Sequence, residues 1–269
     1  MGIAARHLEG TLRGNKLTAY WYTSVVNFGD LITPLLLRHY GFTPIHASVE
    51  HAKVLSTGSI LQVVPQDYSG HILGSGLIKE MHRPLTNAKI WAVRGKLTRD
   101  GIGAPEGTVL GDPGLLLSEL LSRRMKRRYV LGIVPHYAEM DDPRLAMIIN
   151  RYKDDVLFID VKRDPLAVLE EIDSCGAILS SSLHGIVAAD SLGIPSAWMF
   201  LTDAVRGGGY KFRDYFSVFG EEALPVPLSG DETLSELLKH TRPRSNGIEA
   251  IKNELDNSFR SFRAYLASA

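Results

Sequence analysis

The stretch AILSSSLHGIVAADSLGIPS, residues 177–196, sets the expected fold. Its apolar start at 177–179 predicts a buried strand, and apolar residues then recur at helical spacing from Leu183. A Gly-x-Pro pattern at 193–195 ends that helix, and residues 196–200 begin another strand. This order of elements places the loop at the carboxyl end of a parallel strand, where open α/β sheets bind their ligands.

The loop of this unit carries groups that suit an anion. Ser181 and Ser182 supply hydroxyls, and His184 and Gly185 lie in the first turn of the expected helix. Together with the unpaired amides of a helix N-terminus, they favour a phosphate or a carboxylate. The same residues also fit a capped helix with a histidine in its first turn, and local sequence leaves both interpretations open.

Four earlier apolar segments end in a similar way. The strand expected at 17–22 is followed by Asn27, Gly29 and Asp30, and the other three run into Gly58-Ser59, Gly74-Ser75-Gly76 and Arg94-Gly95. Four such strand ends, alternating with helical segments, predict a parallel sheet with a ligand-facing edge.

The composition excludes several functional classes. The chain has 269 residues, no net charge and one cysteine, Cys175. Zero net charge gives no general attraction to nucleic acid, and one cysteine allows no internal disulfide. We find neither a signal-peptide pattern nor a run of roughly 20 apolar residues, so we expect a cytoplasmic protein.

Cofactor motifs are missing from the sequence as well. Without a G-x-G-x-x-G fingerprint or a Walker A loop, neither a dinucleotide site nor a P-loop is supported. An H-E-x-x-H motif does not occur, and one cysteine cannot build a zinc cluster, so we expect no metal and no cofactor. Ser182 and His184 share one loop, which is the wrong geometry for a catalytic triad.

A basic run divides the chain. Residues 123–128 contain five cations in six positions, and the strand–helix pattern restarts after them. We therefore predict two α/β domains, 1–125 and 126–269. The run itself fits either the solvated end of a helix expected over 113–125 or a hinge that faces an anionic lipid surface.

Two later segments complete the expected organisation. Residues 203–215 contain three glycines together with Lys211 and Arg213, which indicates either a mobile cationic loop over a site or an ordinary surface loop. From Gly247 onward, apolar residues at three- and four-residue steps predict an amphipathic helix that packs back on the body.

These residues form a set of anion-binding and acid–base groups. The cations are Arg94, Lys211 and the two histidines His136 and His184, and Asp30 or Asp112 supplies a carboxylate. Asp30 could instead cap the helix expected from residue 31. The set suits transfer chemistry on a small phosphorylated donor without a redox cofactor.

The order and spacing of four short motifs resemble those of the polysaccharide pyruvyltransferases. The motifs are Asn27-Phe-Gly-Asp30, Ala92-Val-Arg-Gly95, Leu110-Gly-Asp-Pro113 and Ser181-Ser-Leu-His-Gly185. Within that family, the short chain and the Pro135-His-Tyr137 element are most similar to the bacterial exopolysaccharide ketal-pyruvate transferases of the xanthan and succinoglycan type. The resemblance runs from about residue 17 to residue 220.

The resemblance implies two Rossmann-like domains in a GT-B-like arrangement with a cleft between them. It also implies transfer of pyruvate from phosphoenolpyruvate to two hydroxyls of an exopolysaccharide sugar, with release of phosphate. The acceptor would be a lipid-linked oligosaccharide at the inner face of the plasma membrane, with peripheral contact through 123–128. Many relatives have arginine where this chain has Ser182, and either Lys211 or Arg213 could replace that charge.

We assign roles to the candidate residues on this basis. His184 is expected to bind the donor phosphate and to act as an acid, His136 to make a second substrate contact, and Asp30 to orient or deprotonate the acceptor. The expected donor-binding residues are Arg94, Ser181, Ser182, His184, Gly185 and Lys211. The expected acceptor-binding residues are Asn27, Asp30, Gly58, Ser59 and Gly76.

Two other functions remain open at this stage. A GT-B-type glycosyltransferase that uses a nucleotide sugar would share the architecture, with Asp190 as the acidic residue to examine for ribose binding. A non-catalytic glycan-binding subunit of a polysaccharide assembly complex would need exposed aromatic side chains, and aromatic residues make up 8% of the chain.

Overall fold

Two parallel β-sheets organise the molecule in the computed structural model, which describes residues 15–203, 207–244 and 247–268. The first sheet has the order β2-β1-β3-β4-β5-β6 and the second the order β11-β10-β9-β7-β8. The first is built from β1 Lys16–Tyr20, β2 Thr43–His46, β3 Val54–Leu55, β4 His71–Leu73, β5 Lys89–Val93 and β6 Val109–Leu110. The second is built from β7 Tyr129–Val134, β8 Val156–Phe158, β9 Cys175–Ser180, β10 Ser196–Phe200 and β11 Val226–Pro227.

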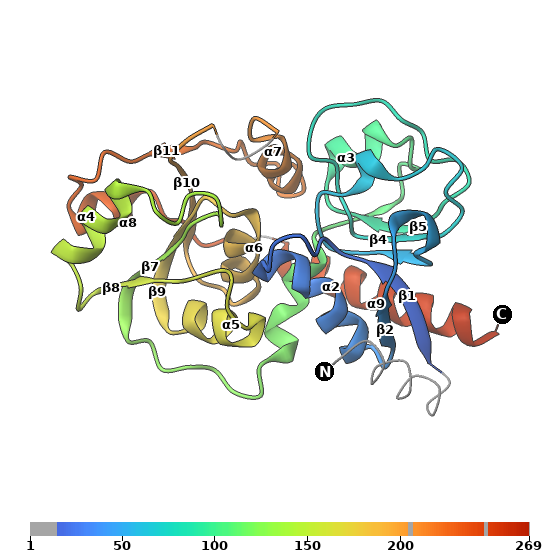
Figure 1. Cartoon of the computed structure of the whole chain (residues 1–269), viewed down its shortest axis with the longest axis horizontal. Coiled ribbons are helices and arrows are strands. Elements are labelled where there is room, and N and C mark those ends of the chain that lie inside the picture. The colour runs from blue at the N-terminus through green and yellow to red at the C-terminus, as the bar shows by residue number, and fades with distance from the viewer. Residues whose placement is uncertain (1–14, 204–206, 245–246, 269) are drawn as a thin grey trace.

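The helices follow the strands in α/β order. The α-helices are α2 Phe28–His39, α3 Lys96–Gly101, α4 Pro143–Arg151, α5 Pro165–Asp173, α6 Leu183–Ser191, α7 Tyr210–Phe216, α8 Leu234–Lys239 and α9 Ile248–Ser268. Short 3₁₀ helices are η1 Val49–His51, η2 Leu61–Val63 and η3 Pro113–Leu120. The second sheet lies on the left in Figure 1 and the first on the right, with α2 and α6 between them.

The unit over 177–196 has the expected structure. Strand β9 lies between β7 and β10, and α6 follows it directly. Gly185 allows α6 to pack closely on β9, because a Cβ at this position would lie 2.3 Å from Ser180 Oγ. This glycine therefore serves helix–strand packing, and its expected part in donor binding remains a prediction.

One apolar core joins the helices between the two sheets. It includes Ile32 of α2, Leu115 of η3, Val187 of α6 and Phe259 of α9, all fully buried. The C-terminal helix α9 packs against the first half of the chain, where Phe259 stacks on Tyr40 with ring centroids 4.5 Å apart. The mixed α/β class is confirmed, while a domain boundary near residue 125 remains a prediction.

The N-terminus of α2 differs from the expectation that Asp30 caps it. The helix begins at Phe28, with Asn27 at the cap position, so Asp30 lies inside its first turn. The Phe28 amide donates a hydrogen bond to the carbonyl of Val161, 2.7 Å away, which ties this helix end to the other half of the chain. The interpretation of Asp30 as a cap was wrong, because the helix starts three residues earlier than expected.

The helix expected over 113–125 is also shorter than the sequence indicates. It is a 3₁₀ helix that ends at Leu120, and the basic run 123–128 lies in an irregular connector rather than at a helix end. The Asp173 carboxylate accepts hydrogen bonds from Arg124 Nε at 2.8 Å and the Met125 amide at 2.5 Å. These contacts hold Arg124 and Met125 in the irregular connector rather than in a continuation of the helix.

The segment 203–215 is not simply a loop. Residues 204–206 lie outside the described ranges, but Lys211 and Arg213 belong to helix α7. Gly207, Gly208 and Gly209 all have positive φ angles and form the turn that leads into this helix. The glycines suggested a longer loop because they directly precede a short helix rich in aromatic residues.

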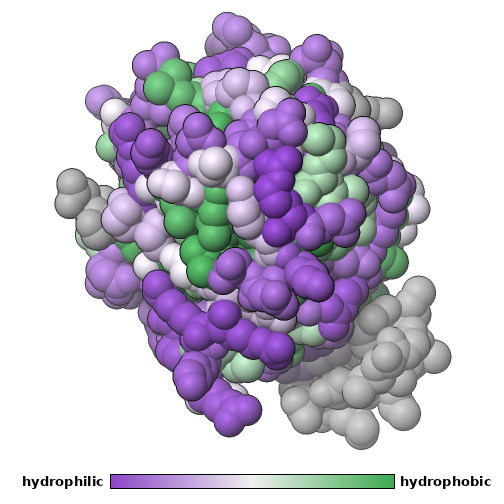
Figure 2. Space-filling view, turned by 90° about the vertical axis from the view of Figure 1, so that its left-hand side faces the viewer, coloured by the Kyte–Doolittle hydropathy of each residue, from purple (hydrophilic) through white to green (hydrophobic). Residues whose placement is uncertain are grey.

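The outer face on the side of α4 and α8 is mainly hydrophilic, with apolar side chains gathered in a narrow central strip (Figure 2). Its lower edge, where the connector 121–128 runs in Figure 1, is strongly hydrophilic. In the described ranges, no helix combines the length and the apolar character needed to cross a membrane.

Candidate active site

The first turns of two helices from different halves of the chain meet around His184. The imidazole rises from the first turn of α6 against Gly29 in the first turn of α2. A Cβ on Gly29 would lie 2.0 Å from His184 Nδ1, so only glycine leaves room for this ring. Expected site residues far apart in the sequence are therefore brought together here.

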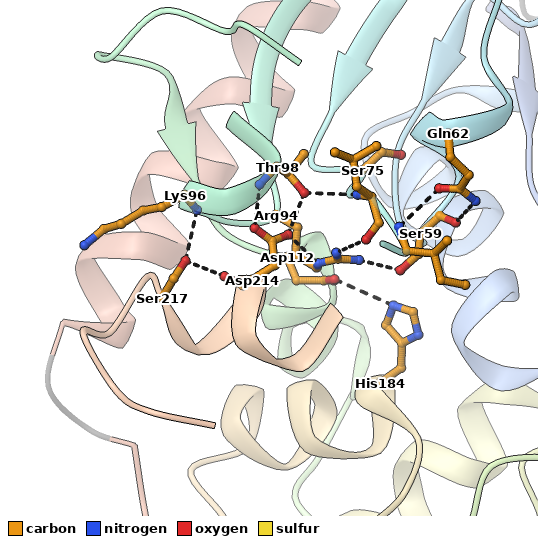
Figure 3. A network of polar contacts seen from close by, with 12 residues as sticks. Ser59, Gln62, Ser75, Arg94, Lys96, Thr98, Asp112, His184, Asp214 and Ser217 are labelled. Carbon is orange, nitrogen blue, oxygen red and sulfur yellow. Dashed lines mark hydrogen bonds and ion pairs between the residues drawn. The ribbon is translucent and has the colours of Figure 1, made fainter. Parts of the chain in front are cut away.

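Asp112 faces His184 from the end of β6. Its Oδ2 lies 3.7 Å from His184 Nε2, while its Oδ1 accepts a hydrogen bond from the Gly114 amide at 2.9 Å and so caps η3. Asp112 is fully buried, and the His184 side chain is 12% exposed. Neither Oδ2 nor Nε2 has a hydrogen-bond partner among the residues that the structure describes. Figure 3 shows the imidazole pointing from α6 toward this carboxylate.

Asp30 lies in the same region. Its Oδ2 accepts a hydrogen bond from Asn27 Nδ2 at 2.9 Å. Burial raises the pKa of Asp30, and the Asn27 bond, His184 and Lys211 oppose that rise. Asn27 therefore orients Asp30, and a carboxyl with a raised pKa is better suited to accept a proton than an ordinary surface aspartate.

Lys211 and His136 complete the charged group. Burial, together with the nearby Arg94 charge, lowers the pKa of Lys211 to about 8, although Asp30 and Glu139 act in the opposite direction. Burial and then the Lys211 charge lower the pKa of His136 to about 4. At neutral pH His136 is therefore a neutral imidazole, while Lys211 is mostly a cation.

Arg94 is buried within protein contacts. Its Nε donates to Asp214 Oδ2 at 2.9 Å, its Nη1 to Ser59 Oγ at 2.5 Å and its Nη2 to the Leu77 carbonyl at 2.5 Å. Figure 3 shows the guanidinium between Ser59 and Asp214. These contacts hold the end of β5 to α7, and direct donor binding by Arg94 remains a prediction.

The expected acceptor residues surround Arg94 and Asp30. A Cβ on Gly76 would lie 2.3 Å from the Arg94 guanidinium carbon, so this glycine makes room for the arginine. Gly58 has a φ of +113°, and a Cβ there would lie 3.9 Å from Asp30 Oδ1. Gly58, Ser59 and Gly76 thus support the charged groups in this structure, and direct acceptor contact by them remains a prediction.

The hydroxyls of Ser180 and Ser181 are used in hydrogen bonds within the protein. Ser180 Oγ donates toward the Val134 and Ser182 carbonyls, and Ser181 Oγ accepts from the His136 amide at 2.9 Å. Ser182 occupies the cap position of α6 but makes no side-chain capping bond. Ser181 therefore positions His136, and Ser182 lies at the helix end that faces the site.

Sequence reasoning missed two buried carboxylates. Glu139, which follows β7, is 4% exposed and has an Oε2 without a hydrogen-bond partner in the described part of the chain. Asp214 of α7 is fully buried against Arg94 and also accepts bonds from Thr98. Glu139 lies three residues after His136, which is the signal that could have identified it.

Asp190 is unavailable for ribose binding because it is used inside the protein. It is buried, and it accepts hydrogen bonds from the Tyr215 hydroxyl at 2.8 Å, Arg244 Nη1 at 3.1 Å and Ser196 Oγ at 3.2 Å. Burial raises its pKa to about 6. Nowhere in the described ranges do three His, Cys, Asp or Glu side chains gather so that they could hold a metal ion.

Comparison with known proteins gives a family match and two relatives. The family described as polysaccharide pyruvyl transferase matches residues 54–199. An uncharacterized protein of Acanthamoeba polyphaga mimivirus is 37% identical over 159 residues, which are 56% of this chain and 55% of that protein, so the match spans about half of the relative. The succinoglycan biosynthesis protein ExoV of Rhizobium meliloti (strain 1021) is 24% identical over 221 residues, 78% of this chain and 67% of that protein.

Proposed function

The chain belongs to the polysaccharide pyruvyl transferase family, and we propose that it transfers pyruvate from phosphoenolpyruvate to two hydroxyls of an exopolysaccharide sugar. The product is a cyclic ketal, and phosphate is released. The observation that carries this proposal is the buried pair of Asp112 and His184 beside Asp30 and Lys211. Asp112 Oδ2 and His184 Nε2 have no hydrogen-bond partner among the described residues. A site of this kind supports both anion binding and proton transfer.

The donor is an anion with a phosphate and a carboxylate, so it needs positive charge and amide donors. Lys211 supplies an ammonium, and the N-terminus of α6 at Ser182 supplies the positive end of a helix. Lys211 takes the place of the arginine that many relatives have at position 182, because Arg213 is exposed and donates to the Gly208 carbonyl.

The proposed reaction balances without a cofactor. One acceptor hydroxyl adds to C2 of phosphoenolpyruvate while a proton is delivered to C3, which becomes a methyl group. The second hydroxyl then forms a bond to C2 and the C2–O bond to phosphate breaks. One hydroxyl proton offsets the proton added at C3, and the other leaves with phosphate. His184 serves as the acid and Asp30 accepts a hydroxyl proton, while the neutral His136 makes a second substrate contact.

Asp112 acts through His184 in this proposal. A carboxylate beside an imidazole fixes the direction of the ring. The separation of 3.7 Å is longer than a hydrogen bond, and such contacts often shorten when a substrate binds. Asp112 is therefore a positioning residue.

The wider setting of the enzyme belongs to the same proposal. The two sheets would flank the donor in a GT-B-like arrangement with a cleft between them. The acceptor would be a lipid-linked oligosaccharide at the inner face of the plasma membrane, in the cytoplasm. Arg123, Lys126, Arg127 and Arg128 of the connector are exposed and could contact anionic lipid there.

Donor titration separates this function from the two alternatives. The purified protein is titrated calorimetrically with phosphoenolpyruvate, UDP-glucose and UDP-galactose, and thermal shifts are recorded in parallel. We expect heat and stabilisation with phosphoenolpyruvate alone. Binding of a UDP-sugar without phosphoenolpyruvate would favour the glycosyltransferase, and binding of no donor would favour a glycan-binding subunit.

A further inference from the structure

A separate pocket opens at the carboxyl end of β10 beneath α7. Its volume is about 310 Å³, and its lining includes Trp198, Leu201, Phe212, Arg213 and Glu139. This volume is in the range of small-molecule sites. None of these residues except Arg213 was considered for the site at the sequence level.

A buried charge gives this pocket a polar anchor. Glu139 Oε1 accepts hydrogen bonds from the Thr202 amide at 3.0 Å and the Thr202 hydroxyl at 2.7 Å. Its Oε2 is buried and has no hydrogen-bond partner among the described residues. A buried carboxylate oxygen without a donor costs free energy, and a ligand hydroxyl would remove that cost.

The apolar wall of the pocket is aromatic. Trp198 and Phe212 stack with centroids 4.3 Å apart and an interplanar angle of 11°, and the Trp198 side chain remains partly exposed. A flat indole beside a carboxylate matches a pyranose ring, which has an apolar C–H face and hydroxyls at its edge. Arg213 at the rim is exposed and keeps the mouth of the pocket polar.

The pocket adjoins the charged group of the active site, because its lining includes Ser181, whose Oγ accepts the hydrogen bond from the His136 amide. Glu139 raises the pKa of Lys211, and Lys211 directly precedes Phe212 in α7. Asp30 acts on the same ammonium. The Lys211 ammonium therefore interacts with a carboxylate of the pocket and with a carboxylate of the active site.

We propose that this pocket binds a hexopyranose unit of the acceptor, with Glu139 accepting a hydrogen bond from a sugar hydroxyl and Trp198 contacting the ring. This inference rests on the proposed pyruvyl transfer, because it places the acceptor beside the donor. A larger cavity of about 690 Å³ lies in the other half of the chain, near Lys53 and Gly70 at the amino ends of β3 and β4. It is a weaker candidate because its lining contributes no buried polar atom without a partner in the described ranges.

The test uses methyl β-D-glucoside and methyl β-D-galactoside, which both carry free 4- and 6-hydroxyls. Binding is followed by saturation-transfer NMR and by tryptophan fluorescence, with inorganic phosphate present in place of the donor phosphate. We expect at least one glycoside to bind, and Trp198→Phe to abolish the fluorescence response without abolishing binding. Glu139→Gln should weaken glycoside binding by about tenfold or more, because an NH2 group, which donates and cannot accept a hydrogen bond, replaces one carboxylate oxygen.

A matched control is available at Glu171, whose Oε2 is also buried without a partner in the described part of the chain but whose Oε1 pairs with Arg163 on another surface. Glu171→Gln should leave glycoside binding unchanged. Phosphoenolpyruvate binding is measured in parallel to keep the two proposals apart. If phosphoenolpyruvate binds the wild type but neither glycoside does, or if Glu139→Gln binds glycoside as well as Glu171→Gln does, the acceptor inference is wrong. If phosphoenolpyruvate itself fails to bind, the proposed function is wrong.

Discussion

Asp112 Oδ2 and His184 Nε2 lie 3.7 Å apart, and they approach each other from opposite halves of the chain. Asp112 follows β6, the last strand of the first sheet along the chain. His184 lies in the first turn of α6, which follows β9, the central strand of the second sheet. Neither atom has another partner in the described ranges, so the pair depends on how the two halves meet. If donor binding moves the two halves of the chain relative to each other, the distance between Asp112 Oδ2 and His184 Nε2 will change with them.

The first prediction concerns Asp112→Asn. The amide keeps an oxygen for the Gly114 amide, so the η3 cap survives, but His184 loses its counter-charge. We expect kcat to fall by about tenfold or more while the Kd for phosphoenolpyruvate changes little, because the ring is no longer held in position for proton transfer. The control is Asp164→Asn, because Asp164 caps α5 in the same manner but lies outside the site. Equal activity losses in the two variants would reduce Asp112 to a helix cap.

The second prediction concerns the space beside His184. Gly29→Ala places a methyl group where the imidazole now lies, 2.0 Å from Nδ1. Alanine favours the helix, so we expect the fold to persist while the ring is displaced and turnover falls by about tenfold or more. Gly107→Ala is the matched control, since a Cβ there has no neighbour within 4 Å. Steady-state phosphate release measures both, and full activity in Gly29→Ala would show that the position of the ring does not matter.

The third prediction concerns pH. The pKa of Lys211 is lowered to about 8, so its ammonium is present below that pH and is lost as the pH rises through it. Phosphoenolpyruvate affinity should therefore be nearly constant from about pH 7 to 8 and weaken by up to about tenfold per pH unit above that. Lys211→Arg should remove this dependence because arginine stays protonated. An unchanged pH profile in Lys211→Arg, measured by calorimetry, would remove Lys211 from the donor site.

The fourth prediction concerns Arg94. Lysine cannot reach Asp214, Ser59 and the Leu77 carbonyl at once, so Arg94→Lys leaves buried groups unpaired. We expect the free energy of unfolding to fall by about 3 kcal/mol in denaturant titrations. Arg260→Lys, in a mostly exposed pair with Asp256, should leave the free energy of unfolding nearly unchanged. Similar small losses in both variants would contradict the structural role assigned to Arg94.

Several strands could be predicted to the residue. Strands β5, β7 and β10 coincide with the mainly apolar runs 89–93, 129–134 and 196–200, and one end of each run is marked by Arg94, Pro135 or Pro195. Strand β2 has no such pattern, since its sequence Thr-Pro-Ile-His contains a proline and few apolar residues. Its place at the edge of the sheet explains how the proline is tolerated.

The site could be predicted in part. Strand ends and helix starts indicated His184 and Asp30, and a glycine-rich cationic segment indicated Lys211. In the structure, His184 and Lys211 both act on the Asp30 carboxyl. The sequence could not show that Arg94 is neutralised by Asp214, which lies 120 positions further along the chain. Glu139 was missed for a related reason, because its buried state depends on Thr202 of another segment. Local patterns locate the edge of a sheet, but tertiary pairing decides which charges remain available.

His184 is the residue on which the account depends most. His184→Gln should keep the fold and much of the donor affinity, because an amide can still hydrogen-bond to phosphate, yet it removes the group that delivers a proton. Turnover should therefore fall by about a hundredfold or more. Calorimetry with phosphoenolpyruvate and a thermal melt establish that the variant is folded and binds its donor.

The most direct measurement is single-turnover phosphate release from phosphoenolpyruvate, with the acceptor glycoside analysed by mass in the same reaction. For the wild type, we predict one phosphate released for each acceptor that gains the mass of pyruvate less one water. In a folded, donor-binding His184→Gln variant, we predict that both signals fall together by about a hundredfold or more. Phosphate release without the acceptor mass gain, or turnover in the variant within a few-fold of wild type, would contradict the account.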